Sequence, residues 1–357
     1  MTFNENANVG GSKARRRGPR IAAAGGGVAG LGVLAVLLFN LLTGGDLSSL
    51  LGGGTAQPSA GSAVEGCQTG ADANRDDTCR LSATSVVLDD FWSSVVSGYQ
   101  GPGLTIVGGS AATPCGAASN ATGPFYCPTD ETVYIDPSFF DILQQQYGGS
   151  GGPLAQMYVL AHEYGHHIQN ITGIMQQHPA NGTGPTSNGV RTELQADCFA
   201  GAWVADAAEQ TDAQGVHYLK EPTPDQIRQA LSAAAAVGDD HIQRQAGAPV
   251  SPETWTHGSS AQRERWFTTG YQGGVEACDT FAARAGELLA DPPSWRTSST
   301  RPSTRMTAGC CWSATATVCT GSSRATPTES RSCFCTAGPA AAAPIGTAGS
   351  STRRSTG

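Results

Sequence analysis

Two histidines and a glutamate lie at the spacing of a metal site within residues 156–170. His162 and His166 are four residues apart, so on a helix both imidazoles lie on one face and can bind one metal ion. Glu163 follows the first histidine, where its carboxylate can reach a water molecule beside the metal and act as a general base. The His-Glu-x-x-His pattern therefore predicts a site for one zinc ion with Glu163 as a catalytic residue.

The third ligand is expected from a second acidic pair. Glu193 and Asp197 are also four residues apart, in a run typical of a helix. Glu193 can complete a His, His, Glu site that leaves one position of the zinc open to water, while Asp197 orients a ligating imidazole. A third histidine at metzincin spacing is excluded, because Gln169 and Thr172 stand at the positions of its glycine and histidine. The pattern indicates the gluzincin type of site.

His257 is the candidate for a catalytic group that does not bind the metal. It lies in residues 256–263, where Ser259 and Gln262 at capping-box spacing predict the start of a helix. A histidine there can donate a hydrogen bond to the oxyanion that develops at a substrate carbonyl. Alternatively, His257 and Arg263 fasten this helix to the core, and the sequence does not decide between the two roles.

Other polar groups are expected outside the site. His167 points about a hundred degrees away from its neighbour around the helix, which favours a supporting or core role. His178 falls in a segment, residues 175–190, whose Pro, Gly, Asn and Ser predict a loop. Residues 239–241, Asp-Asp-His, follow a glycine at the expected end of a helix, and we interpret them as a solvated turn.

Four segments resemble the neutral zinc metallopeptidase family of bacteria. They are residues 125–128, 161–170, 193–201 and 256–263. The resemblance covers residues 66–281. It implies a zincin-like fold, one Zn²⁺ ion, a peptide or protein as substrate, and a peptidase tethered to a membrane.

The elements around the motif predict an α+β fold, mainly helical with a small sheet. Pro153 suits the first turn of the metal-binding helix, and Gly173 suits its end. Further elements are expected as a core helix at 84–99 capped by Thr84 or Ser85, strands at 104–107 and 132–135, and helices at 137–147 and 223–237. In a zincin a strand before the metal helix can pair with extended substrate, and we assign this role to residues 132–135.

The beginning of the chain predicts a membrane anchor. Residues 1–20 end in a basic cluster, and residues 21–42 carry no charge, a length that can span the hydrocarbon layer. We expect a cytoplasmic basic segment at 1–20, one transmembrane helix at 21–43, a Gly/Ser-rich linker at 44–65 and an extracytoplasmic domain at 66–281. The alternative is a cleaved signal peptide, whose apolar region is shorter.

Charge and cysteine content limit the class of protein. Residues 46–281 hold 25 acidic and 8 basic side chains, a net charge of −17, which argues against a nucleic-acid partner. Six cysteines in this region predict disulfides outside the cytoplasm. Fifteen connectivities are possible. We predict local pairs Cys67–Cys79 and Cys115–Cys127, which leave Cys198–Cys278.

The tail, residues 282–357, lacks periodic patterning and is rich in Arg, Ser, Thr, Ala, Pro and Gly. Its composition predicts disorder. The abrupt change also raises the hypothesis that the tail is translated out of frame, which resequencing of the gene around the codon for Ala282 would test.

Together these observations predict a zinc-dependent metallopeptidase, an endopeptidase that hydrolyses peptide bonds with metal-activated water and a glutamate base. The alternative is a catalytically silent zincin-fold module that binds or supports other molecules at the cell envelope. The intact Glu163 favours the enzyme, because a purely structural metal site needs no base beside it.

Overall fold

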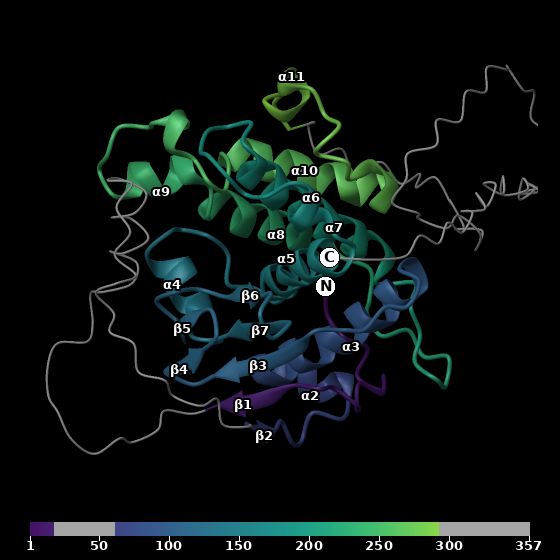
Figure 1. Ribbon diagram of the computed structural model, residues 1–357. Helices are drawn as coiled ribbons and strands as arrows, with labels where there is room; N and C mark the ends of the chain where they lie inside the picture. Colours follow the sequence, from purple (N-terminus) through teal and green to yellow (C-terminus); the bar gives the residue numbers. More distant parts are fainter. Residues whose placement is uncertain (18–60, 293–357) are drawn as a thin grey trace, which may run out of the picture. The chain divides into compact units, whose positions relative to one another are not determined.

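The helix that carries the metal motif, α5 (Pro153–Ile171), lies at the centre of the fold (Figure 1). Pro153 occupies its first turn as predicted, and Gly173, with φ of 79°, follows its end. Most of its residues are buried, because it packs against helices on one side and against the sheet on the other. The computed structural model describes residues 1–17 and 61–292.

The described chain has an α+β fold that is about half helical, with a small sheet. The remaining helices are α2 (Gly70–Arg75), α3 (Asp77–Val95), α4 (Phe139–Gln145), α6 (Ile174–Gln177), α7 (Asn188–Asp206), α8 (Pro224–Ala236), α9 (Asp239–Gln245), α10 (Ser260–Gly273) and α11 (Ala285–Leu288), with 3₁₀ turns at Pro252–Thr254 and Val275–Ala277. The strands are β1 (Arg15–Arg17), β2 (Ser62–Ala63), β3 (Gly103–Val107), β4 (Ser110–Thr113), β5 (Gly116–Ser119), β6 (Phe125–Cys127) and β7 (Thr132–Ile135).

Five of the strands form one sheet in the order β2-β1-β3-β7-β6. β7 pairs in parallel with β3 on one side and antiparallel with β6 on the other. Both of its edges are therefore occupied, and the prediction that residues 132–135 pair with substrate is wrong. The edge strands of this sheet are β2 and β6, and β6 packs against α5.

The first seventeen residues pack on the domain predicted to begin at residue 66. Strand β1 pairs in parallel with β3, and the buried Phe3 is held by Asn74, whose side chain hydrogen-bonds both the nitrogen and the oxygen of its backbone. Three arginines in a row indicated a solvated basic segment. In the structure their backbone forms the strand while their side chains stay exposed or half-buried.

Local signals predicted some helix starts and missed another. The capping boxes at Thr223 and Ser259 begin α8 and α10 as expected. Helix α3 begins at Asp77 with Asp76 as its cap, two turns before the predicted cap at Thr84 or Ser85. These hydroxyls instead bond backbone carbonyls inside the helix.

All three predicted disulfides are confirmed. Cys67 pairs with Cys79, Cys115 with Cys127, and Cys198 with Cys278. The third bond closes a loop of 80 residues and joins α7 to the segment that follows α10. Cross-links over such separations restrict the unfolded chain and typically contribute about 2–4 kcal/mol.

The transmembrane span expected at 21–43 and most of the tail lie outside the described residues. Within 1–17 and 61–292, no helix is long and apolar enough to cross a membrane. The first residues of the tail are ordered into α11, which buries Leu288.

Candidate metal centre

Glycine lets the two site helices approach closely. Gly165 on α5 faces Ala196 on α7, and a β-carbon at Gly165 would lie 2.9 Å from the α-carbon of Ala196, closer than packed carbon atoms approach. Ser187 caps α7 by accepting a hydrogen bond from Val190. The close approach brings Glu193 opposite the histidines of α5.

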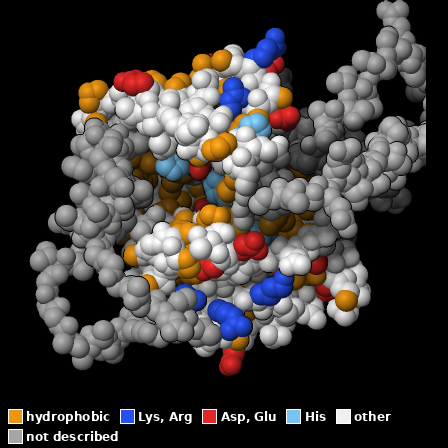
Figure 2. Space-filling view, in the orientation of Figure 1, with side chains coloured by type: hydrophobic (Ala, Val, Ile, Leu, Met, Phe, Trp, Pro, Cys, Tyr) orange, Lys and Arg blue, Asp and Glu red, His pale blue; other side chains and the backbone are white. Residues whose placement is uncertain are grey.

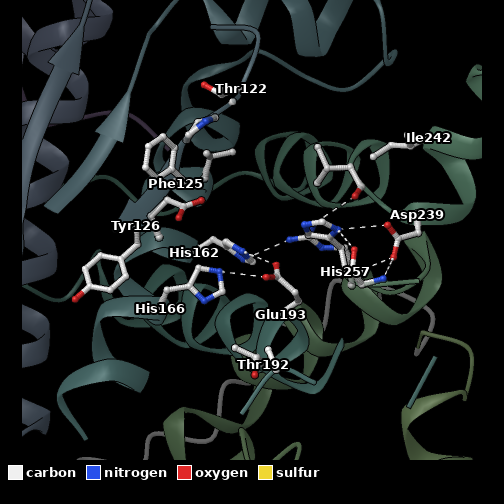
Figure 3. A pocket seen from close by; sticks show the side chains of 18 of the residues that line it. Thr122, Phe125, Tyr126, His162, His166, Thr192, Glu193, Asp239, Ile242 and His257 are labelled. Carbon is white, nitrogen blue, oxygen red and sulfur yellow. Dashed lines mark hydrogen bonds and ion pairs between the residues drawn. The ribbon is translucent and has the colours of Figure 1, made fainter. Parts of the chain in front are cut away.

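The predicted ligand set comes together. Nε2 of His162 lies 3.2 Å from one carboxylate oxygen of Glu193, and Nε2 of His166 lies 3.5 Å from the other. All three ligand atoms lie within 4.8 Å of one another. Figure 3 shows the two imidazoles and the carboxylate pointing toward one another at the floor of a pocket.

This donor set fits a zinc ion. Tetrahedral zinc with ligand distances of about 2.0–2.1 Å places neighbouring ligand atoms roughly 3.3–3.4 Å apart. The separations of 3.2 and 3.5 Å between the Glu193 oxygens and the histidine nitrogens bracket that value. Two imidazoles and one carboxylate form a catalytic type of zinc set, with one position left for water or substrate.

Asp197 lies against His162, the ligand candidate that it is expected to orient. Its carboxylate is fully buried and lies 2.8 Å from Nδ1 of His162. It also accepts hydrogen bonds from Tyr158 at 2.5 Å and from Arg263 at 2.8 and 2.9 Å. A carboxylate only accepts, so Nδ1 carries the hydrogen and Nε2 is left to bind a metal. Burial would raise the pKa of Asp197, but Arg263 and His162 lower it to about 2.

Gln169 orients the second histidine, a role that sequence reasoning missed. Its Oε1 lies 2.9 Å from Nδ1 of His166. The amide is fully buried and donates to the backbone oxygen of Thr192 at 2.7 Å. It therefore links α5 to the residue before Glu193. No spacing rule identifies an amide for this role; the three-residue separation from His166 on one helix is the only signal.

Charges at the site favour an ionised carboxylate facing the histidines. Burial would raise the pKa of Glu193, but His166, His162 and His257 lower it well below its usual value. Burial would also lower the pKa of His162, whereas Asp197, with a contribution from Glu193, raises it to about 10. The site thus attracts positive charge. A divalent cation can supply this charge, and its binding releases the proton that His162 otherwise holds.

Glu163 lines the same pocket and is 7% exposed. Among the described residues, no side chain forms a hydrogen bond or ion pair with its carboxylate. It lies outside the group of three ligands, as the motif predicts for a base.

His257 lies in the opposite wall of the pocket and is fixed by Asp239 (Figure 3). Nδ1 of His257 lies 3.3 Å from Oδ1 of Asp239 and 2.9 Å from the hydroxyl of Thr256. Partial desolvation by the surrounding protein would lower the pKa of His257, but the hydrogen bond to Asp239 and the nearby Glu193 raise it. Its side chain remains 46% exposed, so its other nitrogen can serve the pocket.

The interpretation of residues 239–241 as a solvated turn is wrong. They begin helix α9, and Asp239 and Asp240 are buried. Asp240 accepts hydrogen bonds from Ser260, and Asp239 from the backbone of the turn before α10. Both acids therefore fasten α9 to α10 rather than face solvent.

Two further histidines, His167 and His178, lie outside the group of three candidate ligands. His167 is fully buried and bonds Tyr126 on β6 at 3.1 Å and the backbone oxygen of Gln100 at 2.7 Å. This confirms a supporting position, in which it ties α5 to the edge strand. His178 stacks on Phe281 with ring centroids 4.0 Å apart.

The site opens into a cleft of about 920 Å³. Figure 2 shows a hollow whose floor carries histidine and acidic side chains with apolar side chains around them. One wall comes from the β6 region and α4, and the other from α9 and the turn that carries His257. The apolar lining residues include Pro124, Phe125, Phe139, Tyr147, Val159, Met175 and Ile242.

Comparison with known proteins gives relatives along most of the described chain. The model of a family described as "Putative neutral zinc metallopeptidase" matches residues 3–281. An uncharacterized protein of Mycobacterium tuberculosis is 51% identical over 219 residues, 61% of this chain and 75% of the relative. The uncharacterized protein YpfJ of Escherichia coli K12 is 39% identical over 268 residues, 71% of this chain and 87% of the relative. No solved structure matches.

Proposed function

The chain belongs to the neutral zinc metallopeptidase family, and we propose that it hydrolyses peptide bonds in extended polypeptide substrates. The observation that carries the proposal is the meeting of His162, His166 and Glu193 around one point, with Glu163 in the same pocket. A purely structural zinc site is closed by four protein ligands. Here three ligands meet at the floor of an open cleft.

A zinc ion held by His162, His166 and Glu193 would supply a Lewis acid that polarises the scissile carbonyl and lowers the pKa of water to about 7. Asp197 and Gln169 keep both Nε2 atoms directed at that position. Glu193 contributes a negative charge that stays ionised because of the histidines around it.

Glu163 acts as general base and then as general acid. Its carboxylate takes a proton from the attacking water and passes it to the leaving nitrogen, so no covalent intermediate with the enzyme forms. His257 donates a hydrogen bond to the oxygen that gains negative charge as water adds. Asp239 keeps the Nδ1 side of this imidazole engaged, which leaves Nε2 for the substrate.

The cleft favours an extended chain with apolar side chains. Strand β6 lies at the edge of its sheet and lines the cleft, so it can pair with extended backbone by strand addition. Phe125, Phe139 and Ile242 offer apolar surface on both sides of the metal position. These features support an extended polypeptide as substrate.

Three disulfides support a location outside the cytoplasm, where such bonds persist. Because Met1–Arg17 pack on the same domain through β1, we propose that this segment lies on the same side of any membrane as the domain. This proposal replaces the expectation of a cytoplasmic N-terminus.

Incubation of an unfolded protein with the purified chain tests the function. The wild type should generate new N-termini, and both a zinc chelator and the substitution Glu163→Gln should abolish them while Glu163→Gln keeps its zinc. Native-rate cleavage by Glu163→Gln would remove this residue from the mechanism. Zinc-loaded wild type that cuts no peptide would instead support a binding module.

A further inference from the structure

A chain of buried amides connects the carbonyl of Cys278 with the imidazole of His166. Nε2 of Gln195 donates to the oxygen of Cys278 at 2.9 Å. Nε2 of Gln169 donates to Oε1 of Gln195 at 3.1 Å, and its own Oε1 lies 2.9 Å from Nδ1 of His166. Gln169 is fully buried and Gln195 is 4% exposed, so bulk water does not compete for these bonds.

The carbonyl of Cys278 sets the direction of each hydrogen bond in this series of amides. The Cys278 carbonyl can only accept, so Gln195 must direct its NH₂ group there and its oxygen toward Gln169. Gln169 must then direct its NH₂ group toward Gln195, and this group also donates to the oxygen of Thr192. Only Oε1 of Gln169 is left for His166, so Nδ1 of His166 must carry the hydrogen.

This tautomer is the one that a metal site needs. With the hydrogen on Nδ1, the neutral imidazole has its free electron pair on Nε2, which lies 3.5 Å from Glu193. His162 gets the same tautomer from the carboxylate of Asp197. For His166 the amide of Gln169 selects this tautomer, and an amide adds no further negative charge beside Glu193.

The Cys278 carbonyl, at which the series of buried amides ends, is held rigidly. Cys278 is bonded to Cys198 on α7, three residues after Gln195. Residues 280–283, which follow, are fixed to Arg191 on α7. The Thr280 hydroxyl donates to the backbone oxygen of Arg191. The Arg191 guanidinium donates in turn to the backbone oxygens of Thr280 and Ala283. The carbonyl that sets the direction of the chain therefore has a fixed position.

We infer that Gln169 and Gln195, anchored by the Cys198–Cys278 disulfide, are positioning residues that keep His166 in its metal-binding tautomer. The inference rests on the proposed function only for the identity of the metal. Loss of a hydrogen bond to a ligating histidine typically lowers metal affinity 10- to 100-fold. We expect this loss for Gln169→Met, which keeps the volume of the side chain, and a smaller loss for Gln195→Met, which does not touch His166.

The matched control is Gln156→Met. Gln156 is another buried glutamine on α5, but its amide bonds Arg80 and the oxygen of Gly151, away from the metal position. Zinc affinity of each variant is measured by competition with a chromogenic chelator. Nitrogen-15 spectra of the histidine rings in the metal-free protein report which nitrogen of His166 carries the hydrogen. Gln169→Met should mix the two tautomers, and Gln156→Met should change neither measurement.

Coupling between the variants separates this role from general loss of structure. If the chain acts as a unit, Gln195→Met or the paired substitutions Cys198→Ser and Cys278→Ser should cost less zinc affinity in a Gln169→Met background than in the wild type. Unchanged zinc affinity in Gln169→Met would overturn the inference. If Gln169→Met does not fold, wild-type affinity and tautomer in Gln195→Met would overturn it. Because no substrate is present, a wild type that binds zinc without cleaving peptides would refute the function alone.

Discussion

Asp239 holds His257 by its backbone and by its ring. Oδ2 of Asp239 accepts hydrogen bonds from the backbone nitrogens of Thr256, His257 and Gly258 at 2.8, 2.7 and 3.0 Å, while Oδ1 lies 3.3 Å from Nδ1 of His257. A buried carboxylate that accepts three backbone hydrogen bonds fixes the turn before α10. The imidazole in the cleft wall thereby gains a defined position opposite Glu193.

Asp239→Asn should therefore lower peptide cleavage without removing zinc. An amide can still accept from the turn, but it cannot keep a negatively charged acceptor beside the His257 ring. We expect kcat to fall about 10- to 100-fold, the usual range for groups that orient a functional side chain. Asp240→Asn is the matched control, because this neighbour bonds Arg244 and Ser260 instead. Equal activity of Asp239→Asn and wild type would show that His257 only fastens α10.

Arg263→Met should destabilise the metal-free protein strongly. Both side chains of the Arg263–Asp197 pair are buried, with 4% and 0% exposure, and removal of one partner from such a pair costs about 3–5 kcal/mol. Arg244→Met is the control, since its guanidinium is 58% exposed and surface pairs contribute roughly 0–1 kcal/mol. Urea unfolding measures the free energy of unfolding of both variants. Similar losses in Arg263→Met and Arg244→Met would contradict a stabilising role for the buried pair.

His167→Gln should flatten the pH dependence of stability in the metal-free protein. Burial lowers the pKa of His167, so the folded state binds fewer protons than the unfolded state as pH falls. The folded state keeps its full stability above the ordinary histidine pKa of about 6.5. As the pH falls from there toward the lowered pKa of His167, the free energy of unfolding decreases by up to about 1.4 kcal/mol per pH unit.

Glutamine can keep both hydrogen bonds of His167, to Tyr126 and to the backbone of Gln100, but it cannot titrate. The free energy of unfolding of wild type and variant, measured from pH 7.5 to pH 5, should therefore diverge as the pH falls. Parallel curves would exclude His167 as a source of acid sensitivity.

Single cysteines at positions 5 and 65 should be labelled from the same side of the membrane. Glu5 and Glu65 are both exposed, and β1 and β2, which pair, come from the segments that contain them. A membrane-impermeant thiol reagent applied to intact cells should modify both Glu5→Cys and Glu65→Cys. Labelling of position 65 alone would show that the N-terminal segment is separated from the domain.

The sequence predicted the three candidate ligands because each belongs to a pair with a recognisable spacing. His162 and His166 on one helix, and Glu193 with Asp197 on the next, are four residues apart, and capping boxes marked helix starts nearby. Two cysteine pairs lie only 12 residues apart along the chain, and Cys198–Cys278 followed because these two cysteines were left. The four-residue spacings and the capping boxes are local signals, because they depend only on the geometry of a single helix.

The missed features depend on contacts between distant segments. From the sequence, Asp239 is interpreted as a turn residue because its partners, the backbone of residues 256–258 and the His257 ring, come from a segment 17 to 19 positions later. Gln169 and Gln195 are ordinary helix residues until α5 and α7 pack together. Strand β1 needs β3, about ninety residues away, before its arginines form part of a sheet.

Anomalous scattering at the zinc absorption edge would show whether His162, His166 and Glu193 bind one zinc ion. Crystals of the zinc-loaded wild type should show one peak in the described domain, about 2.0–2.2 Å from Nε2 of His162, Nε2 of His166 and a carboxylate oxygen of Glu193. A zinc position that excludes Glu193, or no peak between the two imidazoles, would contradict the account.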